Sequence, residues 1–141
     1  MKKSLLSLGL ASVLSVVSVA SFADSAVMND VTTGIEAKTG KEIYQTVCIS
    51  CHMAEGKGAK GAGQFPAFAN NMRLMAAEYP AYIVLYGQKG MPGFGNYLDD
   101  DQIAAIVNYI RTSFGNDFKP DFTPEQVAKM RKPDADYGTL D

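Results

Sequence analysis

The chain has 141 residues and a formal net charge of −2, from 13 basic and 15 acidic side chains. This length suffices for one small domain, and the acidic balance argues against nucleic acid as a partner. The composition includes only two cysteines and one histidine, which limits the metal and redox chemistry that the side chains can support.

The first 23 residues have the pattern of a secretory signal peptide. Lys2 and Lys3 precede an apolar stretch over residues 5–20, and small residues around Ala23 provide a cleavage point. The alternative is an uncleaved membrane anchor, because the stretch is nearly long enough to span a bilayer. We expect cleavage after Ala23, export to the periplasm and no stable membrane insertion of the mature chain. Export also implies an oxidising compartment, in which bare cysteines tend to pair.

The first predicted helix follows a polar, acidic segment. Residues 24–37 show weak patterning, and we expect a flexible lead-in there. Thr39 is a good N-cap and Glu42 lies three residues further on, which is the spacing of a capping box. The pattern predicts a helix that runs from this cap to Cys48.

The middle of the chain alternates between loops and short helices. Residues 55–63 (EGKGAKGAG) are too glycine-rich for regular structure, and residues 65–68 (FPAF) favour a buried loop over a strand because of their proline. A short helix is predicted within residues 71–78. Pro80 suits the first position of the next helix, and Gly87 suits its end.

The clearest helix follows a second loop over residues 88–97. Asp99 is its predicted cap, with Gln102 at the capping-box position, and Gly115 is its predicted stop. The tail repeats this start pattern in TPEQVAKMR, residues 123–131, which predicts one more short helix. The chain shows no strand alternation, so the expected fold class is all-α with long loops.

Both cysteines and the only histidine lie in one pentapeptide, Cys48-Ile49-Ser50-Cys51-His52. A thioredoxin-like CxxC is expected after a strand, but here a helix precedes it. Structural zinc sites usually have four protein ligands, and this segment offers three. A structural disulfide is a further alternative, although it would close a very short loop, stabilise little and leave the histidine without a role.

Attachment of a c-type haem accounts for all three side chains. Two thiols three residues apart project from one helical turn and can form thioether bonds with the two vinyl groups on one porphyrin edge. The next residue, His52, would then be the proximal iron ligand. The pentapeptide therefore predicts one haem, bound through Cys48 and Cys51.

The second axial ligand has to be a methionine or be missing, because the chain has only one histidine. Met91 is the favoured candidate, since it lies between Gly90 and Pro92, where glycine allows close approach and proline stiffens the backbone. Met72 and Met75 stay open as alternatives, although methionines spaced like this on a helix are more often core residues. The remaining alternative is an iron without a protein ligand on its distal side.

These segments together resemble a class I, mitochondrial-type cytochrome c domain over residues 38–116. The resemblance is carried by VCISCH, the following glycine-rich loop and proline, the Met-Pro-Gly-Phe segment, and LDDDQIAAIVNYIR. It implies helices wrapped around one covalently bound haem, with the first and last helices crossing at Gly40 and Tyr109. It also implies that Pro66 accepts the proton on the far nitrogen of the proximal histidine, and that Met91 is the axial methionine.

The resemblance also implies a function and a domain order. The segment after the last core helix resembles cytochrome domains that serve periplasmic dehydrogenases, such as quinoprotein alcohol or sugar dehydrogenases. We expect a signal peptide over residues 1–23, a lead-in over 24–37, the haem domain over 38–116 and an extension over 117–141. The expected function is one-electron transfer between a dehydrogenase and a downstream cytochrome or terminal oxidase, rather than catalysis. The alternative is a subunit tightly bound to one dehydrogenase.

Two further expectations concern the haem surroundings. The residues expected to line or back the haem pocket are Phe65, Phe68, Leu85, Phe94, Leu98, Ile103 and Val107. Lys57, Lys60 and Lys89 lie in the loops nearest the two ligand motifs. They would attract an acidic partner surface, or else be ordinary solvated lysines.

Overall fold

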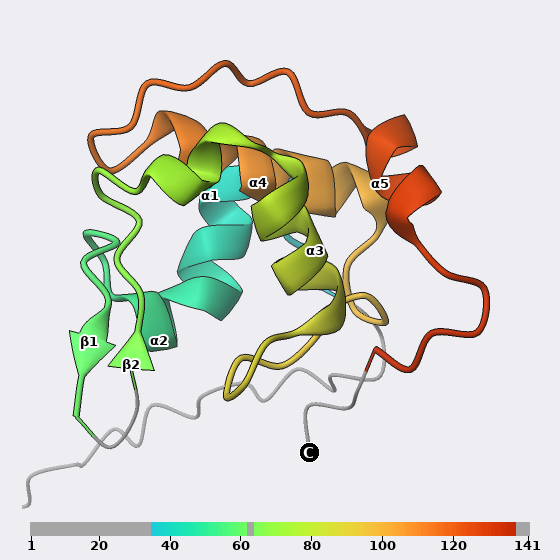
Figure 1. The fold of residues 1–141 in the computed structure, drawn as a ribbon, viewed down its shortest axis with the longest axis horizontal. Helices are drawn as coiled ribbons and strands as arrows, with labels where there is room; N and C mark the ends of the chain where they lie inside the picture. The colour runs from blue at the N-terminus through green and yellow to red at the C-terminus, as the bar shows by residue number, and fades with distance from the viewer. Residues whose placement is uncertain (1–34, 62–63, 138–141) are drawn as a thin grey trace, which may run out of the picture.

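The computed structural model describes residues 35–61 and 64–137 (Figure 1). The signal peptide and most of the predicted lead-in lie outside the described residues. Within the described ranges, no helix has the length and apolar character needed to cross a membrane. The elements are α1 (Gly40–Ile43), the π-helical turn η2 (Tyr44–Cys48), α2 (Ile49–His52), β1 (Ala59–Lys60), β2 (Gln64–Phe65), the 3-10 helix η3 (Met72–Met75), α3 (Glu78–Tyr86), α4 (Asp100–Thr112) and α5 (Pro124–Met130).

Three helices begin at the predicted caps. The capping boxes pair Thr39 with Glu42, Asp99 with Gln102, and Thr123 with Gln126. In each box the cap side chain accepts a hydrogen bond from the third helical residue, whose own side chain accepts one from the backbone of the cap. Two of the otherwise unpaired N–H groups are thereby satisfied at each helix start.

The expectation of an all-α chain is wrong in one place. The glycine-rich segment forms a short antiparallel ladder in which Ala59 pairs with Phe65 and Lys60 with Gln64. Gly56 and Gly58 have φ of 61° and 64°, a region that glycine enters without steric cost. These two residues let the chain turn from the end of α2 into β1.

Two helix boundaries differ from the prediction. α3 begins at Glu78, two residues before Pro80, because proline is tolerated throughout a first turn whose N–H groups have no helical partner. It ends at Tyr86, and Gly87, with φ of 74°, follows as the predicted stop. α4 ends at Thr112, three residues before the predicted stop at Gly115. The short helix predicted within residues 71–78 is a 3-10 helix, η3, and the last residue of that range already belongs to α3.

The core lies where α1 and α3 pack against α4. Ile43, Leu85, Ile103 and Val107 are fully buried there. At the crossing of α1 and α4, a Cβ atom on Gly40 would overlap the carbonyl oxygen of Ala105 and lie 2.5 Å from Cβ of Tyr109. The structure thus brings Gly40 and Tyr109 together, as the resemblance implied, and only a residue without a side chain fits at this point.

Both flanking segments are packed on this core. The Gln102 side-chain amide donates to the carbonyl oxygens of Ile35 and of Ala37, the latter at 2.7 Å. Ordered packing therefore begins before residue 38, and the end of the predicted lead-in is not free of the domain. In the C-terminal extension, Phe122 and Val127 are buried, and α5 lies beside α4 (Figure 1).

Candidate functional site

The two cysteines lie on the continuous helical segment formed by α1, η2 and α2. The backbone N–H of Ile49 donates to the carbonyl of Tyr44, so a π-helical turn ends next to Cys48. The two cysteines are not joined by a disulfide, and Cys48 is half-buried while Cys51 is exposed. Burial, with a smaller contribution from Cys51, raises the pKa of Cys48 to about 12. A pKa this high is unlike that of a reactive redox cysteine, whose pKa is lowered so that the thiolate forms.

His52 is a buried, neutral imidazole. It is only 6% exposed, and its Nδ1 lies 3.2 Å from the carbonyl oxygen of Pro66. A carbonyl oxygen can only accept, so this bond places the proton on Nδ1 and leaves the lone pair on Nε2. Burial lowers the pKa of His52 below its ordinary value, although the bond to Pro66 acts in the opposite direction. A neutral imidazole with one nitrogen held in this way is the form that binds a metal ion.

The short β-ladder places Pro66 beside this histidine. The N–H of Gly58 donates to the carbonyl of His52 at 3.1 Å, immediately before β1. Phe68, just after β2, donates its N–H to the carbonyl of Gly56 at 2.7 Å. The segment from Gly56 to Phe68 is thus bonded at both ends close to His52, and Pro66 lies within it.

An aromatic cluster behind His52 was not predicted from the sequence. The ring of Phe68 stacks on the imidazole with 4.4 Å between centroids, and the ring of Phe114 lies 4.9 Å from that of Tyr44. The buried Asn116 side chain donates to the carbonyl of Phe68 at 2.9 Å. Phe68 was expected only as part of the pocket lining, and no spacing signal connected it with Asn116, which lies 48 residues away.

The predicted methionine ligand lies in the loop between α3 and α4. Met91 is half-buried against the core, and its backbone exchanges hydrogen bonds of 2.9 and 3.0 Å with Gln88. The alternatives Met72 and Met75 are 67% and 61% exposed, so the expectation that they are core residues is wrong. The loop descends to the lower side of the molecule in Figure 1, the side on which α2 also lies.

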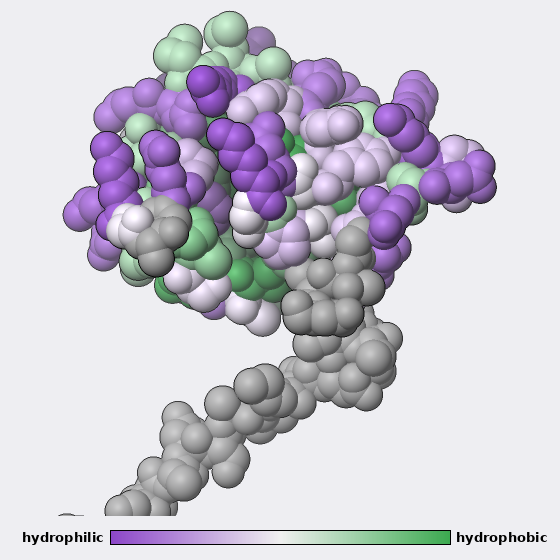
Figure 2. All heavy atoms as spheres, turned by 60° about the horizontal axis from the view of Figure 1, so that its bottom comes forward, coloured by the Kyte–Doolittle hydropathy of each residue, from purple (hydrophilic) through white to green (hydrophobic). Residues whose placement is uncertain are grey.

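The residues expected to line or back the pocket fall into two groups. Leu85, Leu98, Ile103 and Val107 are buried in the core. Phe68 and Phe94 are half-buried and packed against it, and Phe65 is half-buried on β2. In Figure 2, which turns the lower side of Figure 1 forward, hydrophobic residues show between hydrophilic ones on this face. The side chains available around the two ligand candidates are therefore mostly apolar and aromatic.

Residues 35–110 match the family model described as cytochrome C oxidase, cbb3-type, subunit III. The chain belongs to this family of cytochrome c domains. The cofactor of cytochromes c is covalently bound haem c, and Cys48 and Cys51 have the CxxC spacing that its attachment requires. The buried imidazole that follows them, protonated on Nδ1, fits the same group. The function that the family establishes is electron transfer.

Curated relatives include both dehydrogenase subunits and a cytochrome named on its own. The chain is 33% identical over 111 residues to the gluconate 2-dehydrogenase cytochrome c subunit of Pantoea cypripedii, covering 70% of this chain and 25% of the relative. It is 29% identical over 119 residues to the cytochrome c subunit of the quinone alcohol dehydrogenase of Gluconobacter oxydans, covering 75% and 24%. It is 35% identical over 114 residues to cytochrome c-552 of Thermus thermophilus, covering 65% and 83%. The chain thus spans about a quarter of the length of the two dehydrogenase subunits.

Proposed function

We propose that this protein is a periplasmic monohaem cytochrome c whose iron has His52 and Met91 as axial ligands. The helices of a class I fold would surround one haem attached through Cys48 and Cys51. The observation that carries the proposal is the bond from Nδ1 of His52 to the Pro66 carbonyl, because it leaves the lone pair of Nε2 available to the iron. When bound, the haem supplies a one-electron Fe(III)/Fe(II) couple.

The chain's own residues would control that couple in three ways. Pro66 orients the imidazole and increases its basicity as a ligand. The thioether of Met91 is neutral and favours the ferrous state, which raises the reduction potential. The buried side chains of Leu85 and Leu98 contribute an apolar surrounding, which further disfavours the extra charge of the ferric form.

The proposed donor is a periplasmic dehydrogenase, and the proposed acceptor is a downstream cytochrome or terminal oxidase. The names of the dehydrogenase-associated relatives support the donor. Lys57, Lys60 and Lys89 are all exposed, so they are available to attract an acidic partner surface. In this role the chain carries electrons and is not itself an enzyme.

A second candidate is a haem subunit that stays bound to one dehydrogenase. The match to about a quarter of each dehydrogenase subunit favours this candidate, whereas the 83% coverage of cytochrome c-552 favours a free carrier. Size-exclusion chromatography of the native periplasmic protein at low concentration separates the two. A free carrier elutes at the mass of the haem protein alone, and a subunit elutes together with a dehydrogenase.

The ligand set is tested with the haem-loaded protein and two methionine variants. Met91→Ala should abolish the far-red absorption band of the methionine–iron bond and allow carbon monoxide to bind the reduced form. Met75→Ala, at an exposed methionine, is the matched control and should leave both unchanged. A band that survives in Met91→Ala contradicts the assignment of Met91.

A further inference from the structure

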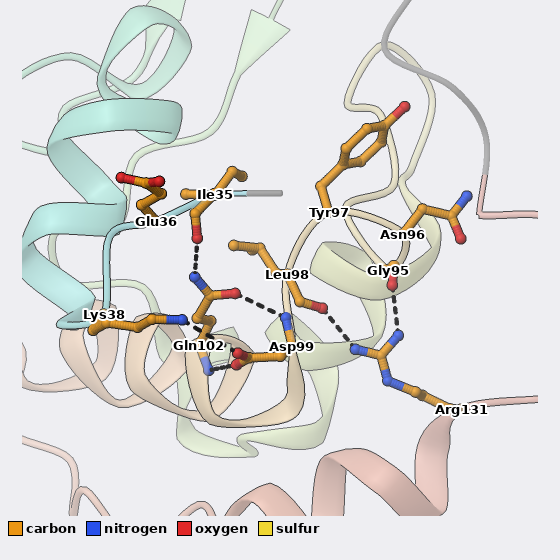
Figure 3. Close-up of a pocket in the computed structure, with 10 residues that line it drawn as sticks. All are labelled: Ile35, Glu36, Lys38, Gly95, Asn96, Tyr97, Leu98, Asp99, Gln102 and Arg131. Carbon is orange, nitrogen blue, oxygen red and sulfur yellow. Dashed lines mark hydrogen bonds and ion pairs between the residues drawn. The ribbon is translucent and has the colours of Figure 1, made fainter. Parts of the chain in front are cut away.

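The segment that follows α5 lies against the loop that contains Met91. We call residues 130–137 the C-terminal strap and residues 87–99 the ligand loop. Within the strap, the Arg131 guanidinium donates to the carbonyl oxygens of Gly95 at 2.6 Å and Leu98 at 2.7 Å (Figure 3). Its Nε also donates to the Asp100 carboxylate at 2.6 Å. One cation therefore binds both the ligand loop and the start of α4.

A tyrosine at the end of the strap packs directly on the same loop. Tyr137 is only 9% exposed, and a Cβ atom on Gly95 would overlap its ring. A Cβ atom on Gly93 would overlap the carbonyl oxygen of Tyr137 and lie 2.8 Å from that of Leu85. The loop needs glycine at both positions because the strap lies so close, so the two segments fit each other at the backbone level.

The strap is also bound to helices outside the ligand loop. The hydroxyl of Tyr86 in α3 donates to the carbonyl of Met130 at 2.5 Å, and its ring stacks on Tyr137 with 5.2 Å between centroids. Val127 in α5 is fully buried. The strap thus has its own support on α3 and α5, from which it can restrain the loop.

Two hydrogen bonds join the ligand loop to α3 shortly after Met91. Phe94 donates to the carbonyl of Val84 at 2.7 Å, and Gly95 donates to that of Leu85 at 3.1 Å. Arg131 and Tyr137 contact this same short stretch, at Gly93, Gly95 and Leu98, so they restrict its movement. We propose that Arg131 and Tyr137 are positioning residues that keep the ligand loop where Met91 can bind the iron. This inference rests on the proposed ligation by His52 and Met91.

The test compares strap variants with matched controls in the haem-loaded, full-length protein. Arg131→Gln removes the cation and its three contacts, and Lys129→Gln makes the same charge change at an exposed site two residues earlier. Tyr137→Ala removes the ring, and Tyr137→Phe keeps it. Loss of one charge-assisted bond, or of one buried ring, corresponds to about tenfold or more in an equilibrium constant. We therefore expect Arg131→Gln and Tyr137→Ala each to bind carbon monoxide in the reduced form at least tenfold more strongly than the wild type.

Two further measurements distinguish positioning from a general loss of stability. The far-red methionine–iron band should weaken in both strap variants, while amide hydrogen exchange should accelerate in residues 88–98 and not in α1. Lys129→Gln and Tyr137→Phe should match the wild type. An unchanged band and unchanged carbon monoxide affinity in both strap variants would overturn the inference while leaving methionine ligation intact. If the wild-type protein lacks the band and Met91→Ala leaves the spectrum unchanged, the proposed ligation by Met91 is wrong. This inference then fails with it.

Discussion

The two regions proposed to bind the haem from opposite sides are stabilised in different ways. In the attachment region, residues 39–68, the bond that orients His52 spans only 14 residues, although the region also packs on α4 and accepts a bond from Asn116. The ligand loop, residues 87–99, accepts bonds from Arg131 that span 33 and 36 residues. The bond that orients the proximal histidine is therefore local, whereas the ligand loop also depends on a segment near the other end of the described chain.

This difference matters because the two kinds of bond tolerate movement differently. Thioether bonds, once formed, keep the cofactor attached even if the surrounding helices fluctuate. A methionine–iron bond is weaker and is lost if its loop opens, because local openings cost far less free energy than global unfolding. Changes in the ligand loop or the strap should thus alter ligation without detaching the haem.

The largest effect is expected when both attachment thiols are removed. The double variant Cys48→Ala, Cys51→Ala has no sulfur with which to form a thioether, so we expect complete loss of haem that survives denaturation. Intact mass and haem staining of a denaturing gel measure this. Ser50→Ala, between the two cysteines, is the control and should stay fully loaded. Haem-stained protein from the double variant would contradict the attachment site.

The next largest effect is expected from a substitution that disturbs the packing of the attachment region on α4. Gly40→Val places a side chain against the backbone oxygen of Ala105, which cannot move without shifting α4. We expect a loss of about 3 kcal/mol in the free energy of unfolding, measured by urea denaturation. Gly61→Val is the control, since a Cβ atom there meets nothing within 4 Å. Equal stability of the two variants would mean that the helix crossing is not as close as described.

A smaller effect is expected inside the ligand loop. Gly95→Ala should displace the ring of Tyr137, at a cost of about 1–2 kcal/mol. Gly90→Ala, in the same loop but facing open space, should be close to neutral. Thermal unfolding reports the stability, and limited proteolysis reports whether the strap is released. The comparison fails if Gly90→Ala releases the strap as readily as Gly95→Ala.

The smallest expected effect is a pH dependence at the start of α1. Hydrogen bonds to Thr39, first of all from its backbone, lower the pKa of Glu42 from the ordinary value of 4.5. A group with a lowered folded-state pKa contributes stability that is present above 4.5 and is lost as the pH falls through the folded value. Glu42→Gln keeps the capping geometry and removes the titration, so its unfolding free energy should fall less steeply in acid. Glu55→Gln, an exposed glutamate beyond α2, should keep the wild-type slope.

Local signals in the sequence were enough to determine the attachment site and most helix starts. A cap such as Thr39 with Glu42, or a CxxC followed by histidine, has its physical meaning within a few residues. The helix starts at Gly40, Asp100 and Pro124 therefore agree with the prediction. The family match likewise confirms the interpretation of the pentapeptide as a haem c attachment motif.

Only the tertiary structure decided which residues support that site. Arg111 in α4 is buried and donates to the carbonyl oxygens of Leu74 and Lys119 at 3.0 and 2.7 Å. Arg131 and Tyr137 carry no local signal at all. Their partners are distant in sequence and are chosen by packing, which no periodicity or cap within one segment can encode.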